Sequence, residues 1–309
     1  MIDTETSKEY EYQLIDQQLI DIYKSDTISI YQNDLKHKNK NQIDIKRVKN
    51  NDNAIDFDTI EFRLDDCLKT GCISLDLSHL NLKQFPLIPT ILHKKLRYLF
   101  VSENELRVIG NLSYLEELIV LDVCDNKLDN IPILPEKLEE LLITNNNIKD
   151  IESLSQYDYL KRLDCSGNQI INIPIIDSLE ILVCNNNKIK NIPDLKKLKK
   201  LSCSNNKLNE LNKFPNLEIL ECDNNNINQI INYKNLKELY CSENDISHIK
   251  NLNKLEILHC YKTNVKKIEY YETLKELICD STDDFLLSGY YTIINSDMYL
   301  NKILSIRFK

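Results

Sequence analysis

One five-position pattern recurs in register along most of the chain. It reads L-x-x-L-x-(I/V/C)-x-x-N-x-(I/L), begins by residue 96 and continues to about residue 282. The intervals between its asparagines vary over the first units and are then identical from Asn168 to Asn244. The asparagines are Asn104, Asn126, Asn146, Asn168, Asn187, Asn206, Asn225 and Asn244. A fixed period of about 20 residues is typical of a solenoid, in which each unit forms one coil and buries its apolar side only by stacking on the next.

This pattern resembles the leucine-rich repeat, and the resemblance covers roughly two thirds of the chain. The longer units near the start, such as NNNIKDIESLSQYDYLKRL, are similar to repeats of phosphatase-regulator-type proteins. The 19-residue units and the stretch IPILPEKLEEL are more similar to the short repeats of bacterial effectors and of repeat proteins from amoebae and their giant viruses. The resemblance implies an α/β solenoid, a right-handed superhelix with a concave parallel β-sheet.

The segments that return from one strand to the next are short. KNIPDLKK, with Pro193, leaves too few residues for a regular helix, so we expect a convex side that is extended or forms single 3₁₀ turns. The recurring asparagine stands at the turn that leaves each strand. Its amide can donate to and accept from backbone groups of neighbouring coils, which would otherwise be buried without partners. Thr263 and Thr282 occupy this position in the last two units and can make only part of those bonds.

Seven cysteines form a second column with the same period. They take the place of Val101, Val123 and Ile143 in earlier units, which favours packing as small apolar residues. Zinc needs about four ligands converging on one ion, whereas a straight column brings only neighbours together, so we predict no metal and no cofactor. Occasional disulfide pairing stays open as an alternative. The column comprises Cys165, Cys184, Cys203, Cys222, Cys241, Cys260 and Cys279, while Cys67, Cys72 and Cys124 lie outside it.

The repeats divide the chain into four predicted parts. They are an N-terminal extension over 1–55, an N-terminal capping helix within 56–72, the solenoid over 73–283 and a C-terminal cap over 284–309. Asp58 is the expected N-cap of the capping helix, with Glu61 three residues later and Gly71 as its stop. The helix should cover the first coil with one face, formed by Ile60, Leu64, Cys67 and Leu68.

The N-terminal extension contains two distinct stretches. Residues 9–24 have apolar positions at helical spacing, so this predicted helix can dock on the solenoid or bind a partner. Residues 33–53 are polar, basic and low in complexity, which indicates a linker. Lys46, Arg47 and Lys49 in that linker also fit a nuclear signal, which leaves a nuclear location as the alternative.

Net charge and cysteine content limit the binding partners and the cellular compartment that we expect. A net charge of -9 and a pI near 5.2 oppose nucleic-acid binding. The chain has no apolar run long enough to cross a membrane, and its first residues do not have the pattern of a signal peptide. Ten cysteines without an export signal indicate a reducing compartment. We therefore expect a cytoplasmic monomer, within a host cell if the chain is a viral or effector protein.

Outward positions on the predicted concave sheet are about half apolar or aromatic, although water should favour polar residues there. High strand propensity explains some of them, but clusters of this kind are typical of interaction surfaces. We predict a protein-binding or peptide-binding surface near the start of the sheet and another near its end. The residues of the first surface are Tyr98, Phe100, Val120 and Leu142, and those of the second surface are Tyr240, Ile257, His259, Tyr261 and Ile278.

The sequence contains no catalytic constellation. Its four glycines are isolated, and its five histidines show no metal-ligand spacing. We therefore predict a non-catalytic protein-interaction module. The likeness to effector-type repeats implies an alternative, a substrate-recognition adaptor or effector linked to a ubiquitin-ligase complex. Relatives of that type carry a large ligase domain after the repeats, and the roughly 27 residues that follow the last unit are too few for one.

Overall fold

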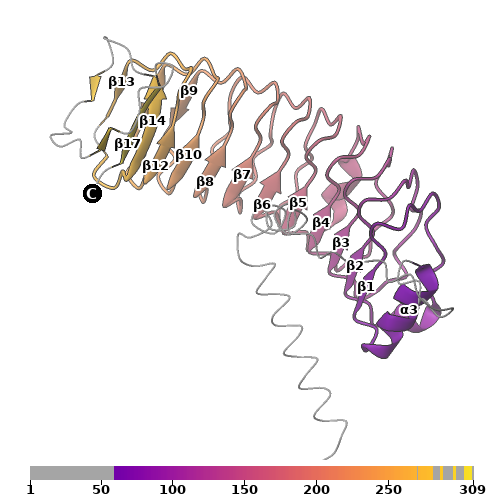
Figure 1. The fold of residues 1–309 in the computed structure, drawn as a ribbon. Helices are drawn as coiled ribbons and strands as arrows, with labels where there is room; N and C mark the ends of the chain where they lie inside the picture. Colours follow the sequence, from indigo (N-terminus) through magenta and orange to yellow (C-terminus); the bar gives the residue numbers. More distant parts are fainter. Residues whose placement is uncertain (1–58, 270, 281–285, 288–294, 297–302, 308–309) are drawn as a thin grey trace, which may run out of the picture. The chain divides into compact units, whose positions relative to one another are not determined.

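A computed structural model describes residues 59–269 and 271–280, together with the backbone of residues 286–287, 295–296 and 303–307. The predicted helix over 9–24 and the linker over 33–53 lie outside the described residues and stay predictions. Within the described part of the chain, one sheet contains thirteen strands in the order β1-β2-β3-β4-β5-β6-β7-β8-β10-β12-β14-β17-β16. Consecutive coils place these strands side by side, as Figure 1 shows.

The strands are short, and most correspond to the centre of one repeat. Neighbours from β1 to β14 pair in parallel and in register, so equivalent residues of successive units stand opposite one another. The C-terminal strand β17 (Ile303–Arg307) pairs antiparallel with β14 and with β16 (Asn295–Ser296). The parallel strands are β1 Ser74–Asp76, β2 Tyr98–Phe100, β3 Val120–Asp122, β4 Glu140–Leu142, β5 Arg162–Asp164, β6 Ile181–Val183, β7 Lys200–Ser202, β8 Ile219–Glu221, β10 Glu238–Tyr240, β12 Ile257–His259 and β14 Glu276–Asp280.

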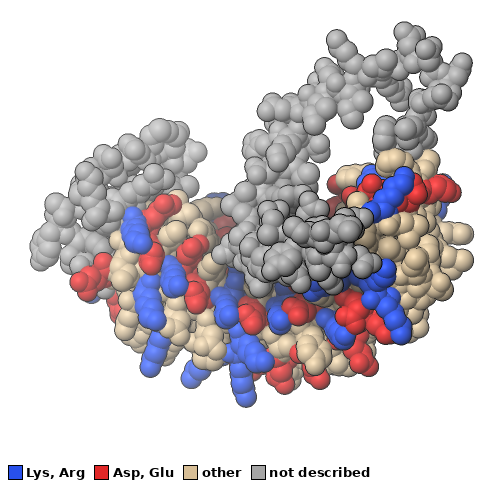
Figure 2. All heavy atoms as spheres, turned by 90° about the horizontal axis from the view of Figure 1, so that it is seen from below, with Lys and Arg blue, Asp and Glu red and all other residues tan. Residues whose placement is uncertain are grey.

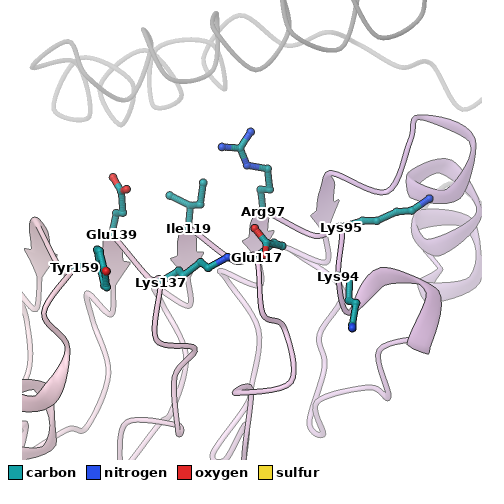
Figure 3. Close-up of a pocket in the computed structure, with 8 residues that line it drawn as sticks. All are labelled: Lys94, Lys95, Arg97, Glu117, Ile119, Lys137, Glu139 and Tyr159. Atoms are coloured by element: carbon teal, nitrogen blue, oxygen red, sulfur yellow. Dashed lines mark hydrogen bonds and ion pairs between the residues drawn. The ribbon is translucent and has the colours of Figure 1, made fainter. Parts of the chain in front are cut away.

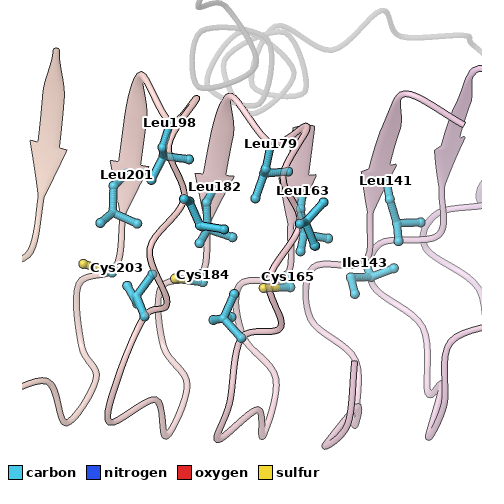
Figure 4. Packing of buried hydrophobic residues seen from close by; sticks show 14 of the residues in the cluster. Leu141, Ile143, Leu163, Cys165, Leu179, Leu182, Cys184, Leu198, Leu201 and Cys203 are labelled. Carbon is cyan, nitrogen blue, oxygen red and sulfur yellow. The ribbon is translucent and has the colours of Figure 1, made fainter. Parts of the chain in front are cut away.

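Each strand places its central leucine in the core. Because side chains alternate along a strand, the residues before and after that leucine point to the opposite, concave face. The central leucines are fully buried from Leu75 on β1 to Leu277 on β14. Figure 4 shows Leu141, Leu163, Leu182 and Leu201 in one row, with Ile143 and the column cysteines in a parallel row. The predicted solenoid is therefore confirmed.

The asparagines form a ladder between coils. Asn187 donates through Nδ2 to the carbonyls of Cys165 in the preceding coil (3.0 Å) and Cys184 in its own coil (3.2 Å). Its Oδ1 accepts from the backbone N–H of Ile170 in the preceding coil at 2.9 Å. The other seven ladder asparagines accept a backbone N–H from the preceding coil in the same way. Thr263 carries a single hydroxyl, which donates to the Cys260 carbonyl of its own coil at 2.8 Å.

The cysteine column lies inside the core. All seven of its thiols are unpaired and buried, as packing predicts, and so are Cys67, Cys72 and Cys124. Burial raises the pKa of each column thiol, in Cys279 to about 12, because a thiolate loses its hydration in this environment. These thiols therefore stay protonated at neutral pH.

The N-terminal end of the solenoid is closed by α3 (Ile60–Lys69). Thr59, and not Asp58, is its N-cap: the Thr59 backbone is extended, and its Oγ1 accepts from the N–H of Phe62 at 3.2 Å. The expected pairing of Asp58 with Glu61 is therefore wrong. The helix begins one residue later, which makes Phe62 the third helical residue.

The apolar face of α3 only partly agrees with the expected one. Cys67 is buried, and Ile60 and Leu64 pack against the core cluster. Leu68, however, is 42% exposed, so it does not cover the first coil. Gly71 follows the helix with a φ of +97°, the conformation that a glycine stop supplies.

The return segments contain 3₁₀ turns at Thr90–Leu92 and Glu152–Gln156, as expected, but they also contain short strands that were not expected. β9 (Gln229–Ile231) pairs in parallel with β11 (His248–Lys250), and β13 (Lys267–Ile268) pairs with β15 (Leu286–Leu287). All seven prolines of the chain precede residue 216. Beyond that point the return segments keep every backbone N–H and are rich in isoleucine, so they can pair with one another.

A row of oppositely charged residues follows the edge of the sheet where the strands begin. The residue after the first leucine of each L-x-x-L segment alternates between Glu and Lys over eight successive coils. Each Glu pairs with the Lys of the next coil, in the pairs Glu139–Lys161, Glu180–Lys199, Glu218–Lys237 and Glu256–Lys275. In this part of the solenoid, each of these ion pairs therefore joins two successive coils.

Candidate protein-binding surface

The structure separates the two predicted clusters by their burial. Tyr98, Val120 and Leu142 lie on β2, β3 and β4 at outward positions, yet all three are buried, at 1%, 2% and 6% exposure. Phe100 is half-buried. The expectation that this first group is exposed is wrong for three of its four members. Their role in binding stays a prediction.

The second cluster lies on adjacent strands and retains exposed atoms. Tyr240 on β10 stands in register with His259 on β12, and His259 stands in register with Ile278 on β14. Ile257 begins β12, and Tyr261 follows it. All five side chains are half-buried. The sheet therefore brings together residues from three successive repeats.

Three contacts fix the centre of this cluster. The rings of Tyr240 and His259 meet edge to face, with centroids 4.7 Å apart. His259 Nε2 lies 3.1 Å from Glu276 Oε1, and the Tyr240 hydroxyl donates to Glu238 Oε2 at 3.2 Å. Burial and the nearby carboxylates, Glu238 first among them, raise the pKa of Tyr240 to about 12. The tyrosine is thus neutral and its ring is held in place.

Acidic residues surround these rings, and a prediction based on apolar and aromatic residues does not include them. Glu221 stands in register with Tyr240 on one side and pairs with Lys200 Nζ at 3.2 Å. Asp223 accepts the N–H of Ser242 at 2.7 Å. Burial raises the pKa of Asp223 above its ordinary value. Charge at the outward positions was the signal that would have found them.

A separate hollow of about 560 Å³ lies at the edge where β2, β3 and β4 begin. It is lined by Lys94, Lys95, Arg97, Glu117, Ile119, Lys137, Glu139 and Tyr159 (Figure 3). Lys137 pairs with Glu117 at 2.6 Å, and Glu139 pairs with Lys161, so much of its charge is neutralised internally. Figure 2 likewise shows both signs of charge interspersed along the coils on the face in view.

No group of three or more His, Cys, Asp and Glu side chains is placed to hold a metal ion in the described segments. None of the helices in the described segments has the length and apolar character needed to cross a bilayer.

Comparison with known proteins agrees with this architecture. The family model described as "Leucine Rich repeats (2 copies)" matches residues 159–197. The chain therefore contains leucine-rich repeats and has the leucine-rich-repeat fold. A search of curated proteins found none that matches it.

Solved structures with this leucine-rich-repeat fold include bacterial proteins. YopM from Yersinia enterocolitica is 24% identical with a TM-score of 0.55, over 67% of this chain and 50% of YopM. The functional domain of InlJ from Listeria monocytogenes, which includes a cysteine ladder, is 26% identical with a TM-score of 0.55, over 67% of this chain and 53% of that domain. YopM from Yersinia pestis, a leucine-rich effector protein, is 22% identical with a TM-score of 0.56, over 66% of this chain and 64% of that protein. The chain therefore spans from half to under two thirds of these structures.

Proposed function

We propose that this leucine-rich-repeat protein is a non-catalytic interaction module that binds a protein or peptide on the concave face of β8, β10, β12 and β14. The observation that carries the proposal is the grouping of Tyr240, Ile257, His259, Tyr261 and Ile278, all half-buried, on adjacent in-register strands. Aromatic side chains with partly exposed apolar surface supply much of the binding energy at protein interfaces.

The repeat fold supports this proposal, because leucine-rich repeats generally serve as interaction scaffolds. Stacked strands give an extended, rigid surface to which a partner can bind without reordering the backbone. The likeness to the effector protein YopM from Yersinia pestis is consistent with a partner that is a separate protein and not a second copy of this chain. Ten free thiols support residence in a reducing, intracellular compartment, and we propose that the module acts there as a monomer.

The test begins with proximity labelling in the native cell and purification of each labelled protein. Affinity for the full chain is then compared with affinity for the double variant Tyr240→Ala, His259→Ala. Tyr159→Ala with His248→Ala is the matched control, because it removes an exposed tyrosine and an exposed histidine outside this concave surface. We expect at least a tenfold loss for the first variant and little change for the control. Equal affinity of both variants for every partner would refute the proposed surface.

A further inference from the structure

We propose that the partner presents an arginine side chain, which the concave face receives beside the Tyr240 ring between the carboxylates of Glu221 and Glu238. The inference deepens the proposed function and rests on it. It concerns a protein or peptide ligand, because the charge of the surface repels polyanions.

The first observation is the sign of the charge at the outward positions. On β8, β10, β12 and β14 these positions contain Glu221, Glu238, Glu276 and Asp280, and no lysine or arginine. The edge of the sheet differs, because there every Glu has a Lys in the neighbouring coil. These four strands therefore place acidic residues on the concave face and contribute no basic residue to it.

The second observation concerns the partners of these carboxylates. Lys200 reaches Glu221 from β7, and His259 contacts Glu276. Glu238 accepts the hydroxyl of Tyr240, a neutral donor, and has no ion pair among the described residues. A carboxylate beside a neutral ring, with no cation of its own, is a favourable place for a cation from another molecule.

The third observation is independent of the acidic cluster. Ser202 stands in register with Glu221 on β7, between the core residues Leu201 and Cys203, so its side chain points to the concave face. It is 1% exposed, and its Oγ has no hydrogen-bond partner among the described residues. Lys200 lies two residues before Ser202 on β7, and its Nζ reaches Glu221 on the neighbouring strand β8 at 3.2 Å. A partner cation that displaces Lys200 from Glu221 therefore brings a donor close to the unsatisfied hydroxyl.

Arginine fits this arrangement better than lysine. Its planar guanidinium can stack on the Tyr240 ring while its N–H groups point outward in the plane. Glu221 and Glu238 flank the tyrosine, one from the neighbouring strand and one from two residues earlier on β10. A planar donor set can bond both carboxylates at once, whereas a lysine ammonium is a compact, strongly hydrated charge.

The test uses the full chain and three short fluorescein-labelled peptides of equal length. They have the same Gly, Ser and Tyr positions and differ at three sites, which contain arginine, citrulline or glutamate. Citrulline has nearly the shape of arginine without its charge. Anisotropy titrations at low and at high NaCl concentration compare the unchanged chain, Glu221→Gln with Glu238→Gln, and the control Glu180→Gln with Glu218→Gln. The control makes the same change in net charge at the edge of the sheet.

We expect the arginine peptide to bind about tenfold more tightly than the citrulline peptide at low salt, with the difference reduced at high salt. The Glu221, Glu238 variant should remove that preference, and the edge control should keep it. Equal binding of the arginine and citrulline peptides, or equal effects of the two variants, would overturn the inference.

A labelled partner from the preceding experiment separates this inference from the proposed function. If the Tyr240, His259 variant weakens its binding and the Glu221, Glu238 variant does not, the concave surface stands and arginine recognition is wrong. If neither variant weakens its binding, the proposed surface itself is wrong.

Discussion

Replacing one ladder asparagine tests the physical basis of the fold, and Asn187→Ala offers the clearest case. Four hydrogen bonds end at this side chain, but they are unequal. The carbonyl of Cys165 keeps a bond from Asn168, and the carbonyl of Cys184 keeps one from Asn206. The N–H of Ile170 has Asn187 Oδ1 as its acceptor and loses it.

One buried N–H without an acceptor costs about 1–3 kcal/mol, and the weakened carbonyl bonds add about 1 kcal/mol. We therefore expect Asn187→Ala to lower the free energy of unfolding by about 2–4 kcal/mol. Asn187→Asp should be at least as harmful, because its second oxygen would face carbonyls and not donate to them. Lys188→Ala, at an exposed position of the same turn, is the control.

Urea unfolding followed by circular dichroism gives the overall change. Hydrogen exchange gives the local one, because long repeat arrays can lose two-state behaviour. The amide of Ile170 should exchange faster in the Asn187 variants than in the control. A loss below about 0.5 kcal/mol, with unchanged exchange at Ile170, would refute the view that the ladder satisfies buried backbone groups.

Four further outcomes follow from the same structure. Iodoacetamide at mildly alkaline pH should leave the seven column cysteines unmodified in the native chain and label them in urea, because burial in the folded chain raises the pKa of their thiols. Rapid labelling of the native chain, detected by mass spectrometry, would contradict this prediction. Gly167→Ala should lower the free energy of unfolding in urea by about 1–2 kcal/mol, because the φ of Gly167 is +64° and the new Cβ would collide with the Asn145 side chain. This loss should exceed that of Gly110→Ala, where no atom lies within 4 Å of the new Cβ. Because the pKa of Asp223 is raised, the folded chain holds the carboxyl proton more tightly than the unfolded chain, and the contribution of Asp223 to stability falls as pH rises above about 3.8. Asp223→Asn should therefore gain stability relative to the unchanged chain as pH rises from about 4 to neutrality. A stability difference that stays constant with pH would disprove this prediction. Thr263→Asn should stabilise the C-terminal coils by about 1 kcal/mol, because an amide can also bond the preceding coil, and faster exchange there would contradict this.

Periodicity predicted the solenoid because its determinants are local and repeated. The central leucine and the ladder asparagine recur at fixed offsets, and parallel stacking turns equal sequence positions into straight columns. The pairing of β9 with β11 was missed, since a return segment looks irregular within any one unit. The signal was comparative: these later segments have no proline, unlike those around Pro193 and Pro215.

The candidate surface was predicted less well than the fold. Alternation correctly assigned Tyr98 and Val120 to outward positions on their strands, but alternation gives direction and not exposure. Both side chains are buried, while Tyr240 and His259, chosen by the same rule, keep exposed atoms. Exposure depends on all the neighbours of a side chain in space, and a pattern read along one strand does not contain them.

The charged residues show how one repeat can give two surfaces with different properties. Strands in a parallel sheet lie about 4.8 Å apart, so a column of identical charges would repel along its whole length. At the edge, the charge alternates in sign from coil to coil, so the charges of Glu218 and Lys237 cancel. Exposed ion pairs of this kind contribute little stability individually. On the concave face, Glu221 and Glu238 occupy diagonal positions beside Tyr240, where no lysine of β8, β10, β12 or β14 points outward. Cancellation at the edge therefore contrasts with the concave face, where Glu221 has Lys200 of β7 as its partner and Glu238 has no ion pair among the described residues. Glu238 thus contributes an uncompensated charge to the local field that an approaching partner meets.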